Sequence, residues 1–372
     1  MREKKKAFKF IDSQKSLDQL VSELEHEKTI GIDTEFVRTR TYFPKLCLIQ
    51  IASTNTMSCI DCLADLDMSK LWSLIYSQDI EKILHSGSQD LEIFYMINKT
   101  LPSNMFDTQI AASLLGYPMQ IGIKNLLMEE LGISISKSET RSDWSKRPLD
   151  KKQIIYAIED IAYLLRLGTS LKKKLKAKKR LHWSNEDCKG MLKLKTGLMD
   201  QGNVWKKIPG IKKLNLHESY VAINLANWRE AAAAKKNIPR KWLMEDSDLM
   251  KLSTININSL KTIDLNWLIG KNFNDQDIDA IEKLIKNPEK NITTIHNSRK
   301  KGRNYYEKNN KLIQQITKEV IKKSREMGIA QEVLATKKDV IGLVNEEESR
   351  LTSGWRKSIL GGELQQLISS SQ

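Results

Sequence analysis

The chain has 372 residues, a length that predicts about two or three domains, because a single hydrophobic core stops growing well below that size. Hydrophobic residues make up 40% and charged residues 29%, a composition that is typical of soluble globular proteins and excludes a disordered or membrane class. No apolar run approaches the roughly 20 residues of a membrane span, and the start MREKKKAFKF lacks the apolar core of a secretory signal, so we expect a cytoplasmic protein.

The cysteines are few and scattered, at positions 47, 59, 62 and 188. Four thiols are too few for a disulfide framework in a chain of this length, which fits a reducing compartment. Cys59 and Cys62 form a C-x-x-C pair, but a structural zinc site needs four ligands and the sequence has no second such pair. We therefore expect these two thiols to occupy a strand and its exit rather than to bind zinc.

The net charge of +15 is unevenly distributed along the chain. Residues 1–168 carry 21 Lys and Arg against 23 Asp and Glu, so all of the positive excess lies after residue 168. A basic half beside a neutral half is typical of a polyanion-binding module joined to another kind of domain, although a generically basic proteome would give the same total. Residues 171–180 hold seven Lys or Arg in ten positions and form either a solvated helix face or a nucleic-acid contact.

The first half of the chain alternates strand-like and helix-like segments. Residues 31–37, 46–53 and 57–62 are short and rich in apolar or β-branched residues, and the short turns between them indicate an antiparallel meander. A further strand at 81–86 is followed by helical periodicity, which is strong from about residue 152. Strands interleaved with helices predict an α/β domain.

The second half of the chain has apolar residues at spacings of three and four, while strand signals fade. Amphipathic helices are expected at about 213–290 and again at about 295–372, in two regions of similar length without a clear sequence repeat. This half is therefore predicted to be all-α, with about two compact bundles.

A pair of acids interrupts the first predicted strand, IGIDTEF. Asp33 and Glu35 stand two apart, so their side chains leave the same face of the sheet, while Thr34 points to the other face. Burying two anions costs free energy unless a divalent cation or another positive group lies between them. An exposed edge strand would avoid this cost, but the surrounding isoleucines and Phe36 argue against full exposure.

Two further acids suit the same site. Asp90 lies at or near the start of the helix after the strand at 81–86, where it would cap the helix or face the other carboxylates. Asp160 lies four residues after Tyr156, on one face of a helix rich in Ala, Ile and Leu. Four oxygen donors without clustered His or thiolate ligands favour Mg²⁺ or Mn²⁺ over zinc. Two such ions activate a water and stabilise the departing oxygen of a phosphodiester, and Tyr156 would hold that water.

Five motifs that contain these residues occur in the order and approximate spacing of one protein family: DTEF with its extension FVRTRTYFPKLCLIQIA, HSGSQDLEIF, FDTQIAASLLGYP, KSETRSDWSKRPL and YAIEDIAYLL. On these motifs, residues 8–168 resemble ribonuclease D of the DEDD exonuclease superfamily. The resemblance implies an α/β, RNase H-like fold (a mixed sheet flanked by helices), 3′→5′ exoribonuclease activity and Tyr156 as the residue that orients the nucleophilic water. It also implies that two divalent metal ions, Mg²⁺ or Mn²⁺, are bound by Asp33, Glu35, Asp90 and Asp160.

The resemblance extends to the subclass, with two departures from the usual pattern. Tyr156 stands four before Asp160 and residue 155 is Ile, which is the tyrosine form rather than the histidine form. Glu159 replaces a residue that is usually small, but it points about 100° away from Asp160 around the helix, so we expect little effect on metal ligation. Cys62 replaces a frequent Pro at a strand exit and should leave the site unchanged.

Residues around the first two motifs are candidates for substrate binding. Basic and aromatic side chains suit a single-stranded RNA 3′ end, because phosphate pairing supplies affinity and stacking tolerates any base. Ordinary surface positions, or a role in supporting Asp90, are the alternatives. The candidates are Phe36, Arg38, Arg40, His85 and Gln89, with Tyr42 as a further aromatic residue of the same loop.

The segment AINLANWREAAAAKKNIPRKWLMEDSDLMKL resembles the helical HRDC module that RecQ-type helicases and ribonuclease D share. We therefore predict an exonuclease domain at 1–170, a basic helical connector at 171–212, an HRDC domain at 213–290 and a second HRDC-like helical domain at 291–372. The basic stretches suggest that the bundles hold structured RNA, and the alternative is a packing unit that does not touch RNA. The matching residues are Trp228, Arg229, Glu230, Pro239, Arg240, Trp242, Asp246 and Leu249.

These observations predict a monomeric, cytoplasmic enzyme that removes nucleotides from RNA 3′ ends as 5′-monophosphates. The family suggests tRNA precursors with 3′ trailers as the substrate, and no membrane or obligate protein partner is expected. One alternative is a 3′→5′ exonuclease that acts chiefly on DNA, because the metal chemistry does not distinguish the sugar. Another is a non-catalytic RNA-binding protein on the same fold, against which the complete set of acids argues.

Overall fold

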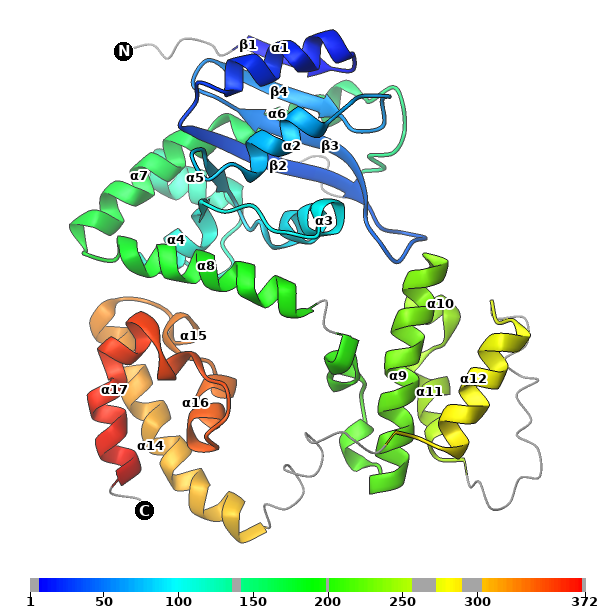
Figure 1. Ribbon diagram of the computed structural model, residues 1–372. Helices are drawn as coiled ribbons and strands as arrows, with labels where there is room; N and C mark the ends of the chain where they lie inside the picture. Colours follow the sequence, from blue (N-terminus) through cyan, green and yellow to red (C-terminus); the bar gives the residue numbers. More distant parts are fainter. Residues whose placement is uncertain (1–6, 136–141, 199–200, 256–271, 290–302, 370–372) are drawn as a thin grey trace. The chain divides into compact units, whose positions relative to one another are not determined.

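A computed structural model describes residues 7–135, 142–198, 201–255, 272–289 and 303–369 (Figure 1). The chain divides into two compact units, which we describe separately. The first unit contains Met1–Val37, Leu46–Lys195 and Asn304–Gln372, and the second contains Arg38–Lys45 and Thr196–Arg303. None of the described helices is long and apolar enough to cross a membrane.

The first unit is built around a six-stranded mixed sheet. Its central strands are consecutive in the chain, as the predicted meander requires, and β3 is antiparallel to β4. The outer strands pair in parallel, β1 with β4, β2 with β5 and β5 with β6. The strands, in their order across the sheet, are β1 (Ala7–Ile11), β4 (Thr56–Asp61), β3 (Lys45–Ala52), β2 (Thr29–Val37), β5 (Glu81–Leu84) and β6 (Met105–Asp107).

Helices cover both faces of this sheet. On one face α1 (Gln14–Leu24), α2 (Ser69–Tyr76) and α3 (Ser88–Asn98) pack against the isoleucines of β2, β3 and β4. The other face is covered by α4 (Thr108–Ser113), α5 (Ile123–Leu131), α6 (Lys151–Ala162) and α7 (Leu164–Ala177), which α8 (Leu181–Leu198) follows. The short edge strands β1 and β6 were not predicted from the sequence, but the α/β class of this half is confirmed.

The C-terminal helices share a hydrophobic core with the sheet-containing part of the first unit. Trp355 stacks on Trp183 with ring centroids 4.4 Å apart, and the guanidinium of Arg356 donates to both carboxylate oxygens of Asp187 at 2.6 and 2.9 Å. The helices after residue 303 are therefore packed against the α/β part of the first unit. Its elements are α14 (Arg303–Met327), α15 (Gln331–Leu334), α16 (Lys337–Val344), the 3₁₀ helix Arg350–Thr352 and α17 (Gly354–Ser369).

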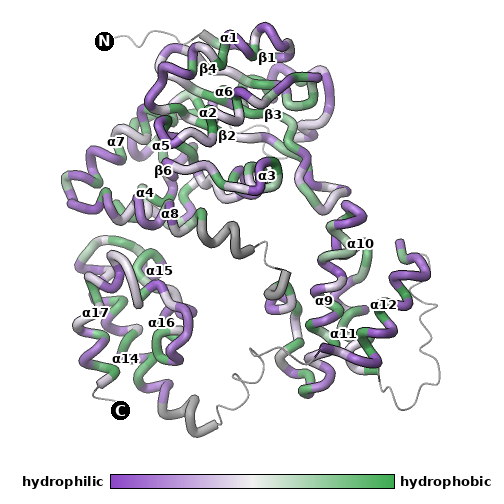
Figure 2. Tube along the Cα trace, in the orientation of Figure 1, coloured by the Kyte–Doolittle hydropathy of each residue, from purple (hydrophilic) through white to green (hydrophobic). Residues whose placement is uncertain are grey.

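The second unit is a small helical bundle with its own apolar core. A capping box between Asn215 and Glu218 starts its longest helix, and Asn237 in the left-handed conformation ends it. Figure 2 shows hydrophobic and hydrophilic residues alternating along the helices, as expected where one side faces a core. The elements are the 3₁₀ helices Gln201–Lys207 and Ile211–Lys213, then α9 (Leu216–Lys236), α10 (Arg240–Leu243), α11 (Asp246–Ser253) and α12 (Asp275–Lys286).

Candidate active site

Strand β2 presents its acids to the sheet face that α6 and α7 cover. A Cβ placed on Gly31 would lie 3.1 Å from the Cβ of Leu164 in α7, so Gly31 allows the helix to approach the strand closely. Asp33 and Glu35 follow at intervals of two and point to the same side as Gly31. The predicted alternation therefore places both acids beneath the helices.

Helix α6 brings a third acid to this pair. A capping box between Asp150 and Gln153 fixes the start of α6, which packs against β2 and β4. One carboxylate oxygen from each of Asp33, Glu35 and Asp160 lies within 4.8 Å of the others. Such a group of oxygen donors is suited to hold a divalent cation of the Mg²⁺ type.

Asp90 approaches the same acids from the first turn of α3. It does not cap the helix, because the N-cap residue is Gly87, and its buried carboxylate instead accepts a hydrogen bond from the hydroxyl of Thr34. Strand β2 pairs with β5 only at residues 29–31, so Thr34 lies beyond the paired edge, where a side chain from α3 can reach it. Sequence reasoning missed Thr34, because alternation alone directs it away from the acids on β2.

Burial raises the pKa values of all four acids, and the charges of neighbouring acids add to the shifts of Asp33 and Glu35. Burial and then the negative charges of Asp90, Asp160 and Glu35 raise the pKa of Asp33 well above its usual value. Burial and the charges of Asp160 and Asp90 raise the pKa of Glu35 to about 9. Burial raises the pKa values of Asp90 and Asp160 to about 6. The charges that act most strongly on Asp33 and Glu35 are thus all negative, and a cation would relieve their repulsion.

Tyr156 lies one turn before Asp160 on the same face of α6. Burial, followed by the charges of Asp160 and Glu35 and a hydrogen bond with Asp160, raises the pKa of its phenol far above the usual value. The ring lies 6.0 Å from that of buried Trp144, centroid to centroid. The phenol is therefore protonated at neutral pH and held beside the carboxylates.

The segment that carries Trp144 is fixed to the sheet by an arginine. Nε and Nη2 of Arg147 donate to the two carboxylate oxygens of Asp61 at 2.7 and 2.6 Å. Nη1 donates to the carbonyl oxygen of Trp144 at 2.8 Å. The motif KSETRSDWSKRPL pointed to this segment, but not to the partners of its Trp and Arg.

The candidate substrate residues have different environments. Phe36 is half-buried near the end of β2, and Gln89 is exposed beside Asp90 in the first turn of α3. Both ring nitrogens of His85 are hydrogen-bonded inside the fold, to the hydroxyl of Thr108 at 2.9 Å and the carbonyl oxygen of Ile121 at 3.0 Å. His85 therefore supports the fold in this structure rather than offering a free nitrogen to substrate.

The loop after β2 belongs to the second unit. Arg38 donates from Nε to the carbonyl oxygen of Tyr42 at 3.0 Å, and Arg40 is exposed. The hydroxyl of Tyr42 donates to Oε1 of Glu230 at 2.7 Å, and the backbone N–H of Phe43 donates to Oδ1 of Asn237 at 3.1 Å. These bonds fix the loop against α9, so the two arginines lie on an ordered turn.

The cysteines behave as the sequence suggested. Cys59 lies within β4 and Cys62 directly after it, and both are free thiols. Burial, followed by the charges of Glu35 and Asp33, raises the pKa of Cys59 to about 12, so this thiol stays protonated. Among the described residues, neither cysteine belongs to a group with the spacing of metal ligands.

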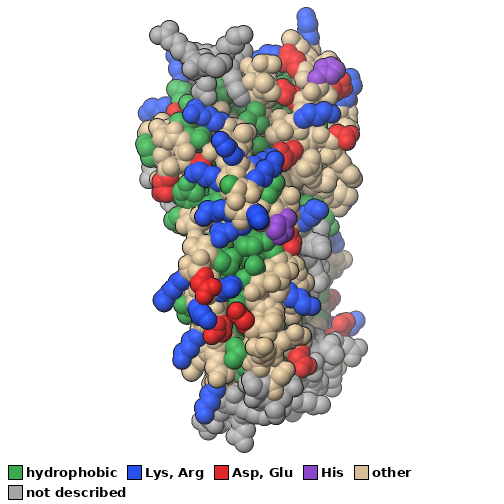
Figure 3. All heavy atoms as spheres, turned by 90° about the vertical axis from the view of Figure 1, so that its left-hand side faces the viewer, with side chains coloured by type: hydrophobic (Ala, Val, Ile, Leu, Met, Phe, Trp, Pro, Cys, Tyr) green, Lys and Arg blue, Asp and Glu red, His purple; other side chains and the backbone are tan. Residues whose placement is uncertain are grey.

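The basic stretch 171–180 is partly neutralised within the first unit. Lys172 forms an ion pair with Glu81, and Lys174 forms one with Glu130 at 2.6 Å. Arg180 donates to the carbonyl oxygens of Leu114 and Met327 at 2.8 and 2.7 Å. Figure 3, which views the molecule from the side of α7, shows Lys and Arg side chains gathered on this face. Five lysines of the stretch are exposed: Lys173, Lys174, Lys176, Lys178 and Lys179.

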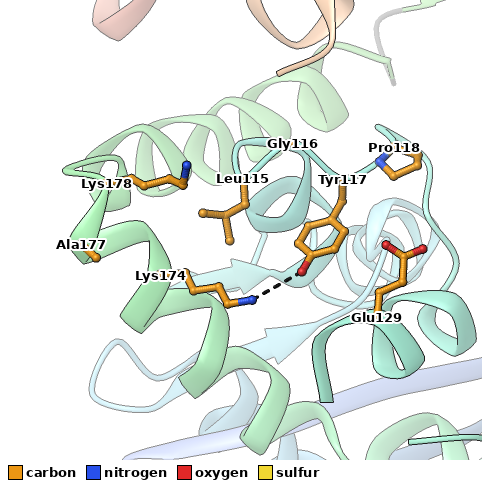
Figure 4. Close-up of a pocket in the computed structure, with 8 residues that line it drawn as sticks. All are labelled: Leu115, Gly116, Tyr117, Pro118, Glu129, Lys174, Ala177 and Lys178. Carbon is orange, nitrogen blue, oxygen red and sulfur yellow. Dashed lines mark hydrogen bonds between the residues drawn. The ribbon is translucent and has the colours of Figure 1, made fainter. Parts of the chain in front are cut away.

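A cavity of about 550 Å³ opens beside these exposed lysines (Figure 4). Lys174 from α7 and Lys178, the C-cap residue of that helix, line it, and Tyr117 and Glu129 lie opposite. The Nζ of Lys174 lies 3.5 Å from the hydroxyl of Tyr117. Of its two lysines, Lys174 is already paired with Glu130, and none of the four acids lines the cavity.

Comparison with known proteins agrees with this arrangement. A sequence family described as 3′-5′ exonuclease matches residues 8–176. A ribonuclease D from Bartonella henselae is 31% identical over 97% of this chain and 90% of its own length. One from Zymomonas mobilis is 33% identical over 96% of this chain and 93% of its own length.

A solved structure extends the likeness to the whole fold. Escherichia coli RNase D, described as an exoribonuclease involved in structured RNA processing, superimposes with a TM-score of 0.82 at 26% identity. The superposition covers 98% of this chain and 99% of that one, which confirms the α/β domain followed by helical bundles. With an acidic cluster suited to metal in the exonuclease domain, the chain belongs to the ribonuclease D family and is a metal-dependent 3′→5′ exoribonuclease.

Proposed function

We propose that Asp33, Glu35, Asp90 and Asp160 together hold two divalent cations, Mg²⁺ or Mn²⁺, at which RNA is hydrolysed. The observation that carries this proposal is the group of three carboxylates within 4.8 Å of one another, with Asp90 adding its charge to theirs. The donors are oxygens, which such cations prefer. When bound, a pair of ions would activate water and stabilise the departing 3′ oxygen in an in-line displacement.

Tyr156 acts as the residue that orients the attacking water. Because its pKa is raised, the phenol keeps its proton at neutral pH and acts on the water by hydrogen bonding rather than as a base. Its hydrogen bond with Asp160 and the neighbouring ring of Trp144 hold the hydroxyl in place. Positioning of this kind raises the turnover rate more than the affinity for RNA.

The direct test of the site is Asp33→Asn, which keeps the side-chain shape and removes the charge. We expect turnover on a single-stranded RNA oligonucleotide to fall by at least about 10³-fold, since charge at the reacting centre is lost. The affinity for the same RNA should stay within about threefold. Retained turnover would refute the role of Asp33.

The substrate we propose is an RNA with a structured body and a single-stranded 3′ end, such as a tRNA precursor with its 3′ trailer. The E. coli relative is described as acting in structured RNA processing, which supports this class. Matched RNA and DNA oligonucleotides, and a tRNA precursor, should be compared in Mg²⁺. Faster degradation of DNA would favour the rival DNA exonuclease, and no degradation of any of them would favour a non-catalytic RNA-binding protein.

The exposed lysines at the end of α7 are proposed to contact the phosphates of the RNA body. The stretch 171–180 contains no acid, so its exposed lysines repel one another until a polyanion binds. The double variant Lys176→Glu/Lys179→Glu should weaken binding of a tRNA precursor. The slope of the logarithm of the binding constant against the logarithm of salt concentration should fall by roughly one for each phosphate contact that is lost. A control with the same charge change, Lys15→Glu/Lys28→Glu on exposed positions of the first unit, should bind as wild type.

We further propose that residues 213–290 form an HRDC domain and 291–372 a second, related module, with 1–170 as the exonuclease domain and 171–212 as the connector. Trp242 in α10 is 50% exposed, and Lys241 beside it is also exposed, a combination that suits a base and its phosphate. Trp242→Ala should lower RNA affinity by roughly fivefold or more if the module touches RNA. Unchanged affinity would favour a packing role.

We propose a cytoplasmic monomer, which sedimentation can test.

A further inference from the structure

Gln50 lies within β3 and is completely buried. Among the residues that the structure describes, neither Oε1 nor Nε2 of its amide has a hydrogen-bond partner. Nearly all buried polar side-chain atoms in proteins are paired, and each unpaired one costs about 1–3 kcal/mol. We therefore expect the amide to have a hydrogen-bond partner in the active, metal-bound enzyme.

The strand register places Gln50 opposite Asp33. Strands β2 and β3 are neighbours joined by a loop of a few residues, which only an antiparallel pair allows. A Cβ on Gly31 would lie 3.4 Å from the Cβ of Ala52, so these two residues face each other across the pair. Asp33 lies two residues after Gly31, and Gln50 lies two residues before Ala52. In an antiparallel pair these two residues therefore also face each other, on the same side of the sheet.

The next strand supports this position. Gln50 is the direct partner of Cys59 in the antiparallel pair of β3 and β4, so both side chains leave the same face. The thiol of Cys59 is affected by the charges of Glu35 and Asp33, as expected for a residue in the same row. Gln50 thus stands between Asp33 and Cys59. Opposed residues have Cβ atoms about 4.5–5.5 Å apart, a span that a glutamine amide can bridge.

We propose that Gln50 is a positioning residue for Asp33: its Nε2 donates to one oxygen of the ionised carboxylate and leaves the other oxygen free for the divalent cation. The inference rests on the proposed metal site. A neutral amide suits this task, because it fixes the orientation of the carboxylate without neutralising the charge that the cation requires. A lysine or arginine at position 50 would instead compete with the metal.

The test compares Gln50→Met, which has nearly the same volume but no amide, with the wild type. We expect the metal-free melting temperature to stay the same or rise, since a buried unpaired amide is removed. We expect the dissociation constant for Mn²⁺, measured by calorimetry without RNA, to increase about 10- to 100-fold, as found for residues that support metal ligands. Turnover should recover when Mn²⁺ is raised by the same factor.

Two further variants make the outcome decisive. Ser58→Ala removes another buried, unpaired polar atom, on β4 and on the opposite face of the sheet, and should leave the Mn²⁺ affinity unchanged. If Gln50→Met does not fold, Gln50→Leu, which also removes the amide, is used in its place. Mn²⁺ affinity within threefold of wild type in the folded variant would overturn the proposal. If Asp33→Asn also leaves Mn²⁺ binding unchanged, the metal site itself fails rather than the role of Gln50.

Discussion

Glu35 on β2 and Asp61 on β4 lie on the same sheet, two strands apart, but in opposite electrostatic environments. Burial alone would raise the pKa of Asp61, but the hydrogen bonds and charge of Arg147 outweigh it and lower the pKa below its usual value. Burial also raises the pKa of Glu35, and there the neighbouring charges, from Asp160 and Asp90, raise it further, to about 9.

This difference is the basis on which we assign Asp61 to the fold and propose Glu35 as a metal ligand. The fold supplies a counter-charge to Asp61, which fixes the segment that carries Trp144. Among the described residues, the charges that act on Glu35 come from other acids, and this mutual repulsion is free energy that a bound cation can recover.

The largest effect is expected for Asp160→Asn. Removing one negative charge from the cluster should lower turnover by at least about 10³-fold, because a proposed metal ligand is lost. The same change should raise the metal-free melting temperature, since the remaining acids repel each other less. Turnover assays and calorimetric melting of the same preparation check both effects. A variant that is both inactive and less stable than wild type would contradict the comparison.

Tyr156→Phe should give a large but incomplete loss of turnover. We expect kcat to fall by about 10²-fold, since the water loses one orienting hydrogen bond while the four acids remain. KM should change less than about threefold, because the phenol is not assigned to RNA binding. Steady-state kinetics on one oligonucleotide separates the two constants, and a change confined to KM would place Tyr156 in substrate binding instead.

Asp61→Asn should act on stability more than on chemistry. Loss of the charged partner of Arg147 is expected to lower the free energy of unfolding by about 2 kcal/mol, because hydrogen bonds to a charged group are broken in a largely buried place. Metal affinity should not change. Chemical denaturation measures the stability, and a variant as stable as wild type would show that the pair contributes little.

The smallest effect is the pH dependence of metal-free stability. The folded-state pKa values of Asp90 and Asp160 are about 6 and that of Glu35 about 9, above the usual values near 4. The folded protein therefore holds protons that the unfolded chain releases, so stability falls as pH rises from about 5 through 6 and on towards 9. We expect the melting temperature in a chelator to fall by several degrees or more over this range. Saturating Mg²⁺ should largely remove this dependence of the melting temperature on pH. If the melting temperature depends on pH equally with and without Mg²⁺, the dependence arises from groups outside the four acids.

Local patterns in the sequence predicted much of the site. The alternation of β2 places Asp33 and Glu35 on one face, and the helical spacing of α6 places Tyr156 and Asp160 together, because each depends only on the geometry of one element. Asp90 was predicted as a site residue, but the alternative of a helix cap was left open. In the structure Gly87 is the N-cap and the carboxylate of Asp90 accepts from Thr34, a bond that depends on where β5 ends.

Features that depend on distant partners were not predictable in this way. The lysines of 171–180 look alike in sequence, yet Lys172 and Lys174 are neutralised by Glu81 and Glu130, which are far away in the chain. The helices after residue 303 were expected as a separate bundle, but they share a core with the exonuclease domain through Trp183 and Trp355. An amphipathic pattern shows that a face is buried, not what buries it.

The most direct test of the metal site is to count Mn²⁺ ions bound per chain, by titration calorimetry or electron paramagnetic resonance, in the wild type, Asp33→Asn and Asp61→Asn. The account predicts two ions in the wild type and in Asp61→Asn, and at most one in Asp33→Asn. No bound ion in the wild type, or an unchanged count in Asp33→Asn, would contradict it.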